Sequence, residues 1–157
     1  MVPPLIPAFR ISDPAEALAE VRTTHLLHGQ GGCLRLNLDV TLAGRDGLSR
    51  MVGEVLETVA LRPDRVDLIV DAGYIADERA VRQLEPKARA LLEWATQEPW
   101  RHVALAASSF PPSIKELLPD QRHLLRRWEV EPHRVRCRAL ILGRIGSCLP
   151  SGSTHRS

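Results

Sequence analysis

The sequence is short of several residue types, and each shortage excludes a class of protein. Cys33, Cys137 and Cys148 are its only cysteines, and their spacing fits neither a disulfide framework nor a zinc site. Aromatic residues make up 4% of the chain, too few to interleave with a basic stripe on a nucleic-acid-binding face. No apolar run approaches the roughly 18 residues that span a bilayer, and no secretory segment begins the chain. We therefore expect a cytoplasmic protein with reduced thiols that binds neither membrane nor nucleic acid.

The length and the charge distribution predict one folded domain and a basic end. The 157 residues are 44% hydrophobic and 25% charged, which suits a single domain with its own core. Residues 1–120 carry 13 basic against 17 acidic side chains, whereas residues 121–157 carry 8 against 2. We expect a domain over residues 1–130 and an irregular basic tail over 131–157. The tail composition fits either a segment that docks on an acidic partner or a shifted reading frame.

The hydrophobic pattern alternates strands with helices. Apolar residues at every second position, or in a continuous run, predict strands, and apolar residues that repeat about every 3.6 positions predict helices. Asp13 is expected to cap the first helix. Pro86 is expected to kink or break the third helix. The expected strands are 5–11, 33–39, 66–71 and 103–109, and the expected helices are 13–27, 48–59, 77–97, a short one from 113, and 121–130.

This order predicts an α/β fold with a parallel sheet and helices outside it. Two architectures fit: an open doubly wound sheet, or about half of an eight-unit barrel of the TIM type. The second strand favours the barrel, because it places Arg35, Asn37 and Asp39 on one face, where a barrel interior offers polar partners. We expect a partial, roughly half, TIM-barrel-like sheet.

Three segments resemble successive motifs of the bacterial "beta protein" family, which has a phage-derived name. They are Val66 to Gly73, Trp100 to Pro111 with its Ser-Ser-Phe-Pro end, and Arg127-Trp128-Glu129; Gly32 to Leu36 resembles the preceding strand. The resemblance covers residues 5–129. It implies a barrel-like α/β fold in proteins about twice this long, without an established reaction.

Two departures from the family pattern suggest a truncated member. The chain begins at a strand from the middle of the family, and a Gly-Asp-Tyr-like segment after Glu129 is missing. Half a barrel would have two unpaired sheet edges, so we expect a poorly soluble or self-associating chain.

In either architecture, ligands bind at the carboxyl ends of the strands. The polar residues expected there are Arg35, Asn37, Asp39, Asp71, Ser108 and Ser109. Asp39 and Asp71 could act as a catalytic carboxylate pair or hold a divalent cation, and Arg35 could neutralise an anionic substrate. Alternatively, Asp71 caps a turn, Arg35 is its structural partner, and the serines satisfy strand ends. Arg35, Asp39 and Asp71 are expected to face one hollow.

Other polar residues give weaker signals. Arg127 and Glu129 enter the substrate-binding set through the resemblance alone. His25 and His28 lie three apart on a helix without a third ligand, so no metal site is assigned, and His102 begins a strand at the opposite end from the expected site. No cofactor or partner can be named. Two hypotheses follow: a family member that binds an anionic ligand or metal, its reaction open, and a non-catalytic interaction protein in a phage or defence setting.

Overall fold

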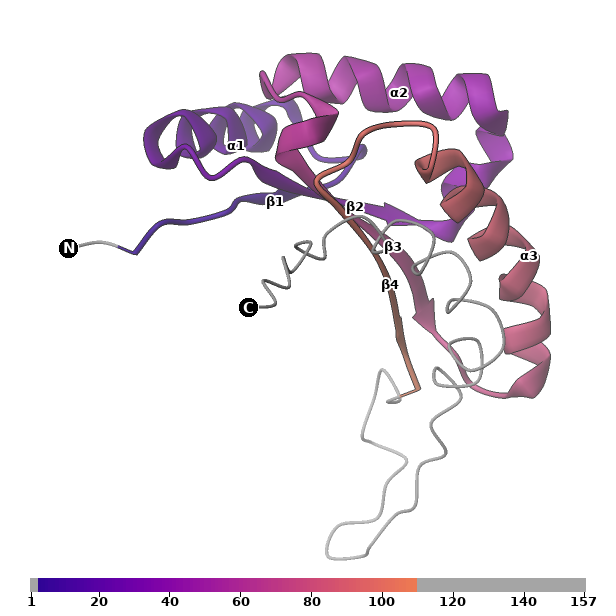
Figure 1. Cartoon of the computed structure of the whole chain (residues 1–157). Helices are drawn as coiled ribbons and strands as arrows, with labels where there is room; N and C mark the ends of the chain where they lie inside the picture. The colour runs from indigo at the N-terminus through magenta and orange to yellow at the C-terminus, as the bar shows by residue number, and fades with distance from the viewer. Residues whose placement is uncertain (1–2, 110–157) are drawn as a thin grey trace, which may run out of the picture.

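The computed structural model describes residues 3–109 of the chain, apart from the side chains of residues 41–43. Three α-helices alternate with four strands, and two short 3-10 helices (η1 and η2) lie between them (Figure 1). In chain order the elements are β1 (Ala8–Phe9), α1 (Ala15–His28), β2 (Gly32–Asn37), η1 (Leu38–Ala43), α2 (Gly44–Thr58), η2 (Pro63–Arg65), β3 (Val66–Tyr74), α3 (Glu78–Ala95) and β4 (His102–Ser108).

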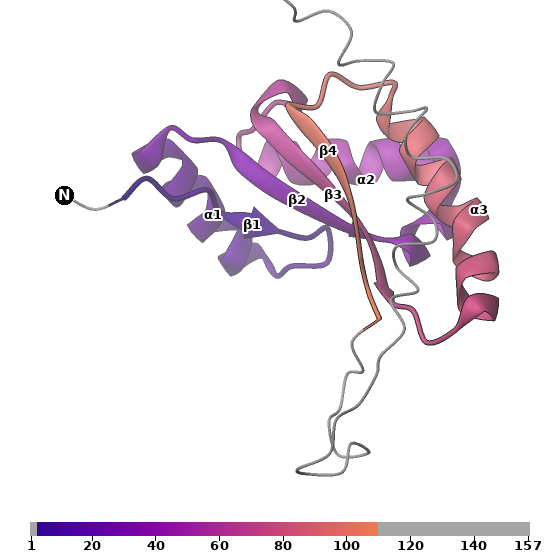
Figure 2. The ribbon, with the colours of Figure 1, turned by 60° about the horizontal axis from the view of Figure 1, so that its bottom comes forward.

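The four strands form one parallel sheet in the order β1-β2-β3-β4. All three α-helices cover the same face of this sheet, as two views of the ribbon show (Figures 1 and 2). Each strand therefore lies beside the one before it, and each helix returns over the same side. Within residues 3–109, the sheet does not close on itself. This arrangement confirms the expected α/β fold of a partial, barrel-like parallel sheet.

The core lies between the sheet and the helices. Leu34 and Leu36 of β2 and Leu68 and Val70 of β3 point to the helices and are at most 1% exposed. Alternate residues of the same strands point the other way, since successive side chains of a strand lie on opposite faces. The sheet thus has a covered face and, within the described residues, an open face without helices.

The two faces of the third strand are covered to different extents. Leu68 and Val70 are fully buried, whereas Ile69 is half-buried on the open face. A barrel interior would produce this apolar pattern, because side chains from neighbouring strands cover it.

The α2 helix shows most simply why these residues fold as they do. Its buried residues, Leu48, Val52, Val55 and Leu56, are separated by four, three and one positions, so they lie on one side of the helix and face the sheet. Trp94 of α3 donates its indole N–H to the Ser49 hydroxyl at 2.9 Å. The ring centroids of Trp94 and Trp100 lie 5.9 Å apart. Both tryptophans are buried and belong to the core between the helices and the sheet.

A tight turn joins α1 to β2 and requires glycine. Gly29 ends the helix in the left-handed conformation. Gly31 has a φ of 78°, and a Cβ there would lie 2.1 Å from the carbonyl oxygen of Arg65. Arg65 and Arg101 donate to the Gly29 and Gln30 carbonyls at 2.7 Å. The turn is thereby fixed to the strand ends beside it.

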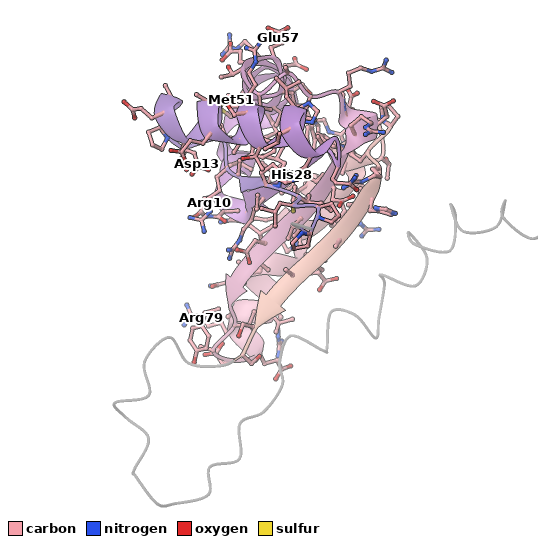
Figure 3. All side chains as sticks on the ribbon, turned by 90° about the vertical axis from the view of Figure 1, so that its left-hand side faces the viewer. Arg10, Asp13, His28, Met51, Glu57 and Arg79 are labelled. Atoms are coloured by element: carbon pink, nitrogen blue, oxygen red, sulfur yellow. The ribbon has the colours of Figure 1, made fainter. Side chains whose placement is uncertain are left out.

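Several element ends differ from the sequence-based expectations. β1 is only two residues long. Asp13 does not cap α1: its carboxylate accepts the Arg10 backbone N–H at 2.8 Å, and the two residues lie together in Figure 3. α3 continues through Pro86, which is exposed, so the alternative of two separate helices is wrong.

Within residues 3–109, no helix combines the length and the apolar character needed to cross a membrane. The predicted helices after residue 112, the domain boundary at residue 130 and the basic tail lie outside the described residues and stay predictions.

Candidate functional site

An arginine–aspartate pair joins β2 to β3 on the open face of the sheet. Arg35 donates its Nε–H to Oδ2 of Asp71 at 2.7 Å, and its Nη2 contacts the same oxygen. Asp71 is 9% exposed, whereas the Arg35 side chain is 46% exposed. A buried carboxylate therefore holds a guanidinium whose other side faces solvent.

The second oxygen of Asp71 organises the end of β3. Oδ1 accepts the backbone N–H of Gly73 at 2.9 Å, and Gly73 has a φ of 67°. The pairing of β3 with β4 is irregular here, because Asp71 pairs with Ala106 and Tyr74 pairs with Ser108. One extra residue on β3 marks a bulge. Asp71 thus has both proposed structural roles, as a turn cap and as the partner of Arg35.

The remaining strand-end candidates surround this pair. Asn37 is exposed at the end of β2 and is the cross-strand neighbour of Asp71. Ser108 is the last residue of β4 and lies on the open face, two residues after Ala106. Ser109 is buried. The structure therefore brings Arg35, Asn37, Asp71 and Ser108 to the carboxyl end of the open face.

Asp39 does not join this group. β2 ends at Asn37, so Asp39 lies in η1 and not on the strand. Its side chain is 87% exposed and lies 3.9 Å from the ammonium of Lys87 on α3. The expectation that Arg35, Asp39 and Asp71 face one hollow is wrong for Asp39, because the chain turns into a 3-10 helix two residues earlier than the sequence alternation suggests.

Sequence reasoning missed two residues at this end of the molecule. Tyr74 lies on the last pairing position of β3 and is 44% exposed. Arg79, in the first turn of α3, lies at the end of the sheet to which the strand arrows point (Figure 3). The signal for Tyr74 was its position directly after a glycine at a strand end, where a bulge can extend the strand.

A second ionic cluster lies at the opposite, amino-terminal end of the open face. Arg101 donates Nε–H and Nη2–H to the two oxygens of Asp67 at 2.7 and 2.6 Å. The ring Nδ1 of His102 lies 2.7 Å from Oδ1 of the same carboxylate. The Arg101 hydrogen bond, aided by His102, lowers the pKa of Asp67, and Asp67 in turn raises the pKa of Arg101. His102 therefore lies away from the strand carboxyl ends, as the sequence predicts.

Cys33 is the cross-strand neighbour of Asp67 on the same face. Burial, followed by the Asp67 charge, raises the pKa of its thiol. A thiol with a raised pKa is protonated at neutral pH and is a poor nucleophile or metal ligand. Among the described residues, no three histidine, cysteine, aspartate or glutamate side chains come together as metal ligands.

The other candidate residues, Arg127 and Glu129, lie outside the described part of the chain.

Comparison with known proteins identifies the family: the chain belongs to the Beta protein family, whose model matches residues 3–140. No curated protein and no solved structure matches the chain.

Proposed function

We propose that this member of the Beta protein family binds a small anionic ligand at the carboxyl end of its open sheet face, with Arg35 as the principal contact. The main observation behind the proposal is how the Arg35 guanidinium is held and how much of it is exposed. Asp71 fixes it on one side, while nearly half of the side chain stays exposed. Within residues 3–109, no group other than Asp71 accepts a hydrogen bond from it. A guanidinium that is held in place and has donors that no other residue of 3–109 uses suits a carboxylate or phosphate group.

The same contacts favour an anion over a metal ion. Divalent cations such as Mg²⁺ and Ca²⁺ bind to available carboxylate oxygens. In Asp71, Oδ2 accepts from Arg35 and Oδ1 accepts from Gly73. A cation would have to displace the guanidinium and leave it beside a like charge. Asp71 is therefore proposed as a positioning residue for Arg35.

The residues around the pair support the same ligand class. The amide of Asn37 is exposed next to Asp71 and can donate to a ligand oxygen. Arg79 adds a second positive charge at this end of the sheet. Ser108 provides a hydroxyl on the open face. Because Asp71 partly neutralises Arg35 and the site is open to water, we expect dissociation constants of about 1–10 mM for simple anions, equivalent to roughly 3–4 kcal/mol.

Titration of the full 157-residue chain with inorganic phosphate and with acetate, followed by amide chemical shifts at constant ionic strength, tests the proposal. Arg35→Gln keeps a donor for Asp71 but removes the charge, and should weaken binding at least about tenfold. Arg62→Met is the matched control, because Arg62 is exposed at the opposite end and contacts Asp64; it should bind as the wild type does.

Arg35→Lys provides a second variant should Arg35→Gln unfold. A lysine keeps the charge but loses the planar fork, so intermediate affinity is expected. Equal affinity in wild type, Arg35→Gln and Arg35→Lys would contradict the proposal. That result would favour the other hypothesis, a non-catalytic interaction protein.

A further inference from the structure

Tyr74 is an exposed aromatic side chain beside the Arg35–Asp71 pair. Tyr74 is 44% exposed and is the last residue of β3. It lies on the open face, because its partner Ser108 lies there. Ser108 follows Ala104 and Ala106 on the open face of β4. The other aromatic residues of the described chain, Phe9, Trp94 and Trp100, are buried, so Tyr74 alone among them is exposed.

The bulge at Gly73 places the tyrosine. Without the extra residue, the alternation along β3 would turn position 74 toward the helices. With the extra residue, Tyr74 lies on the same face as Asp71 and is the next paired residue on that face. Since two residues of a strand rise about 7 Å, the Tyr74 backbone lies roughly that far beyond Asp71, where the Arg35 guanidinium is held.

Small side chains of β4 lie beside the Arg35–Asp71 pair on the open face. Ala104 and Ala106 of β4 lie opposite Ile69 and Asp71 on the open face. Their methyl groups do not rise above the sheet as longer side chains would. A planar group can lie on this surface with its edge against the Tyr74 ring and a charged substituent at Arg35.

We infer that the ligand of this site carries its oxyanion on a planar aromatic ring, with the oxyanion at Arg35 and the ring against Tyr74 and the alanines of β4. This inference rests on the proposed anion-binding function and names the ligand class. Stacked or edge-to-face ring contacts are favourable beyond the apolar area that they bury. A ring also removes water from the Arg35 donors, which strengthens their hydrogen bonds to the oxyanion.

Two matched ligand pairs test the ring contact in the full chain: phenyl phosphate against methyl phosphate, and benzoate against acetate. Each pair keeps the oxyanion and changes the group beside it. In the wild type, the aromatic member of at least one pair should bind about five times more tightly. Tyr74→Ala should remove that preference, and Tyr74→Phe should retain it, because the phenol hydroxyl is not needed for a ring contact.

Leu27→Ala is the control, since Leu27 is a 78% exposed apolar residue at the end of α1 and its loss should not change the preference. The inference is overturned if neither pair shows a preference, or if the preference survives in Tyr74→Ala. The proposed function is tested separately by the non-aromatic ligands: methyl phosphate and acetate should bind in Tyr74→Ala as in the wild type and should lose affinity in Arg35→Gln.

Discussion

Replacement of Asp67 by asparagine should destabilise the protein in a pH-dependent way. Asp67 connects the start of β3 to the start of β4 through two hydrogen bonds from Arg101 and one contact with His102. Arg101 also donates to the Gln30 carbonyl in the turn before β2, so the cluster joins three strand ends. Asparagine has nearly the same shape but carries no charge.

The magnitude follows from the exposure of the pair. Hydrogen bonds to charged groups each contribute about 1.5–3 kcal/mol. The Asp67 and Arg101 side chains are both 27% exposed, so solvent weakens the interaction. Asparagine can still accept one bond. We therefore expect the substitution to lower the free energy of unfolding by about 2 kcal/mol at pH 7, or the melting temperature by roughly 4–8 °C.

The pH dependence has a defined sign. The Arg101 hydrogen bond and, less strongly, His102 lower the pKa of Asp67 in the folded protein, although partial burial opposes them. The unfolded chain binds a proton at about pH 3.9, above the folded value. The stabilisation is therefore complete above about pH 5 and is lost as the pH falls below about 4 toward the folded pKa. The difference between wild type and Asp67→Asn should shrink over that range.

Urea unfolding followed by far-ultraviolet circular dichroism, from pH 7 to pH 3, measures this difference. Asp64→Asn is the matched control, because Asp64 contacts Arg62 at 3.2 Å with a 45% exposed side chain. It should cost less than about 0.5 kcal/mol at every pH. The reasoning is refuted if Asp67→Asn is as stable as the control at pH 7, or if its deficit is undiminished at pH 3.

Two further substitutions test the turn and the core by the same unfolding measurement. Gly31→Ala should destabilise by about 2 kcal/mol or more, because its Cβ would lie 2.1 Å from the Arg65 carbonyl oxygen, whereas Gly29→Ala meets nothing within 4 Å and should cost only about 1 kcal/mol for its left-handed φ. Similar losses in the two glycine variants would contradict the close approach. Leu68→Ala should cost about 2–5 kcal/mol, since Leu68 is fully buried, and Leu27→Ala should cost close to nothing. A loss below about 1 kcal/mol at Leu68 would mean that the covered face is not the core.

The architecture could be predicted from the sequence because it depends on local periodicity. The spacing of Leu48, Val52, Val55 and Leu56 defines one apolar face of α2 whatever the helix packs against. The order of strands and helices then leaves few arrangements, and the parallel neighbour-to-neighbour sheet is the simplest. Membership of the Beta protein family agrees with the motifs of the second, third and fourth strands.

The strand ends could not be predicted, because tertiary contacts determine them. The alternation of Leu36, Asn37, Leu38 and Asp39 continues unbroken in the sequence, and Leu38 is buried, with 4% of its surface exposed. The backbone nevertheless leaves the sheet after Asn37, and η1 packs against α2 and α3. Asp39 then lies near Lys87 and not near Asp71. On β3 the error is opposite, because the bulge at Gly73 extends the strand from Asp71 to Tyr74.

The two arginine–aspartate pairs of the open face differ in a way that only the structure reveals. Asp67 and Arg101 are equally shielded at 27% exposure, and Arg101 uses further donors on the Gln30 carbonyl. The two side chains of that pair use their hydrogen-bonding groups on each other and on the neighbouring turn, and so connect the strand ends. The Arg35 side chain is 46% exposed, whereas its partner Asp71 is 9% exposed, so within residues 3–109 the carboxylate is enclosed while much of the guanidinium faces outward. In the sequence, each pair is one arginine and one aspartate on or next to neighbouring strands. This asymmetry of exposure supports the proposal that the carboxyl end of the open face binds a ligand, whereas the pair at the amino-terminal end stabilises the fold.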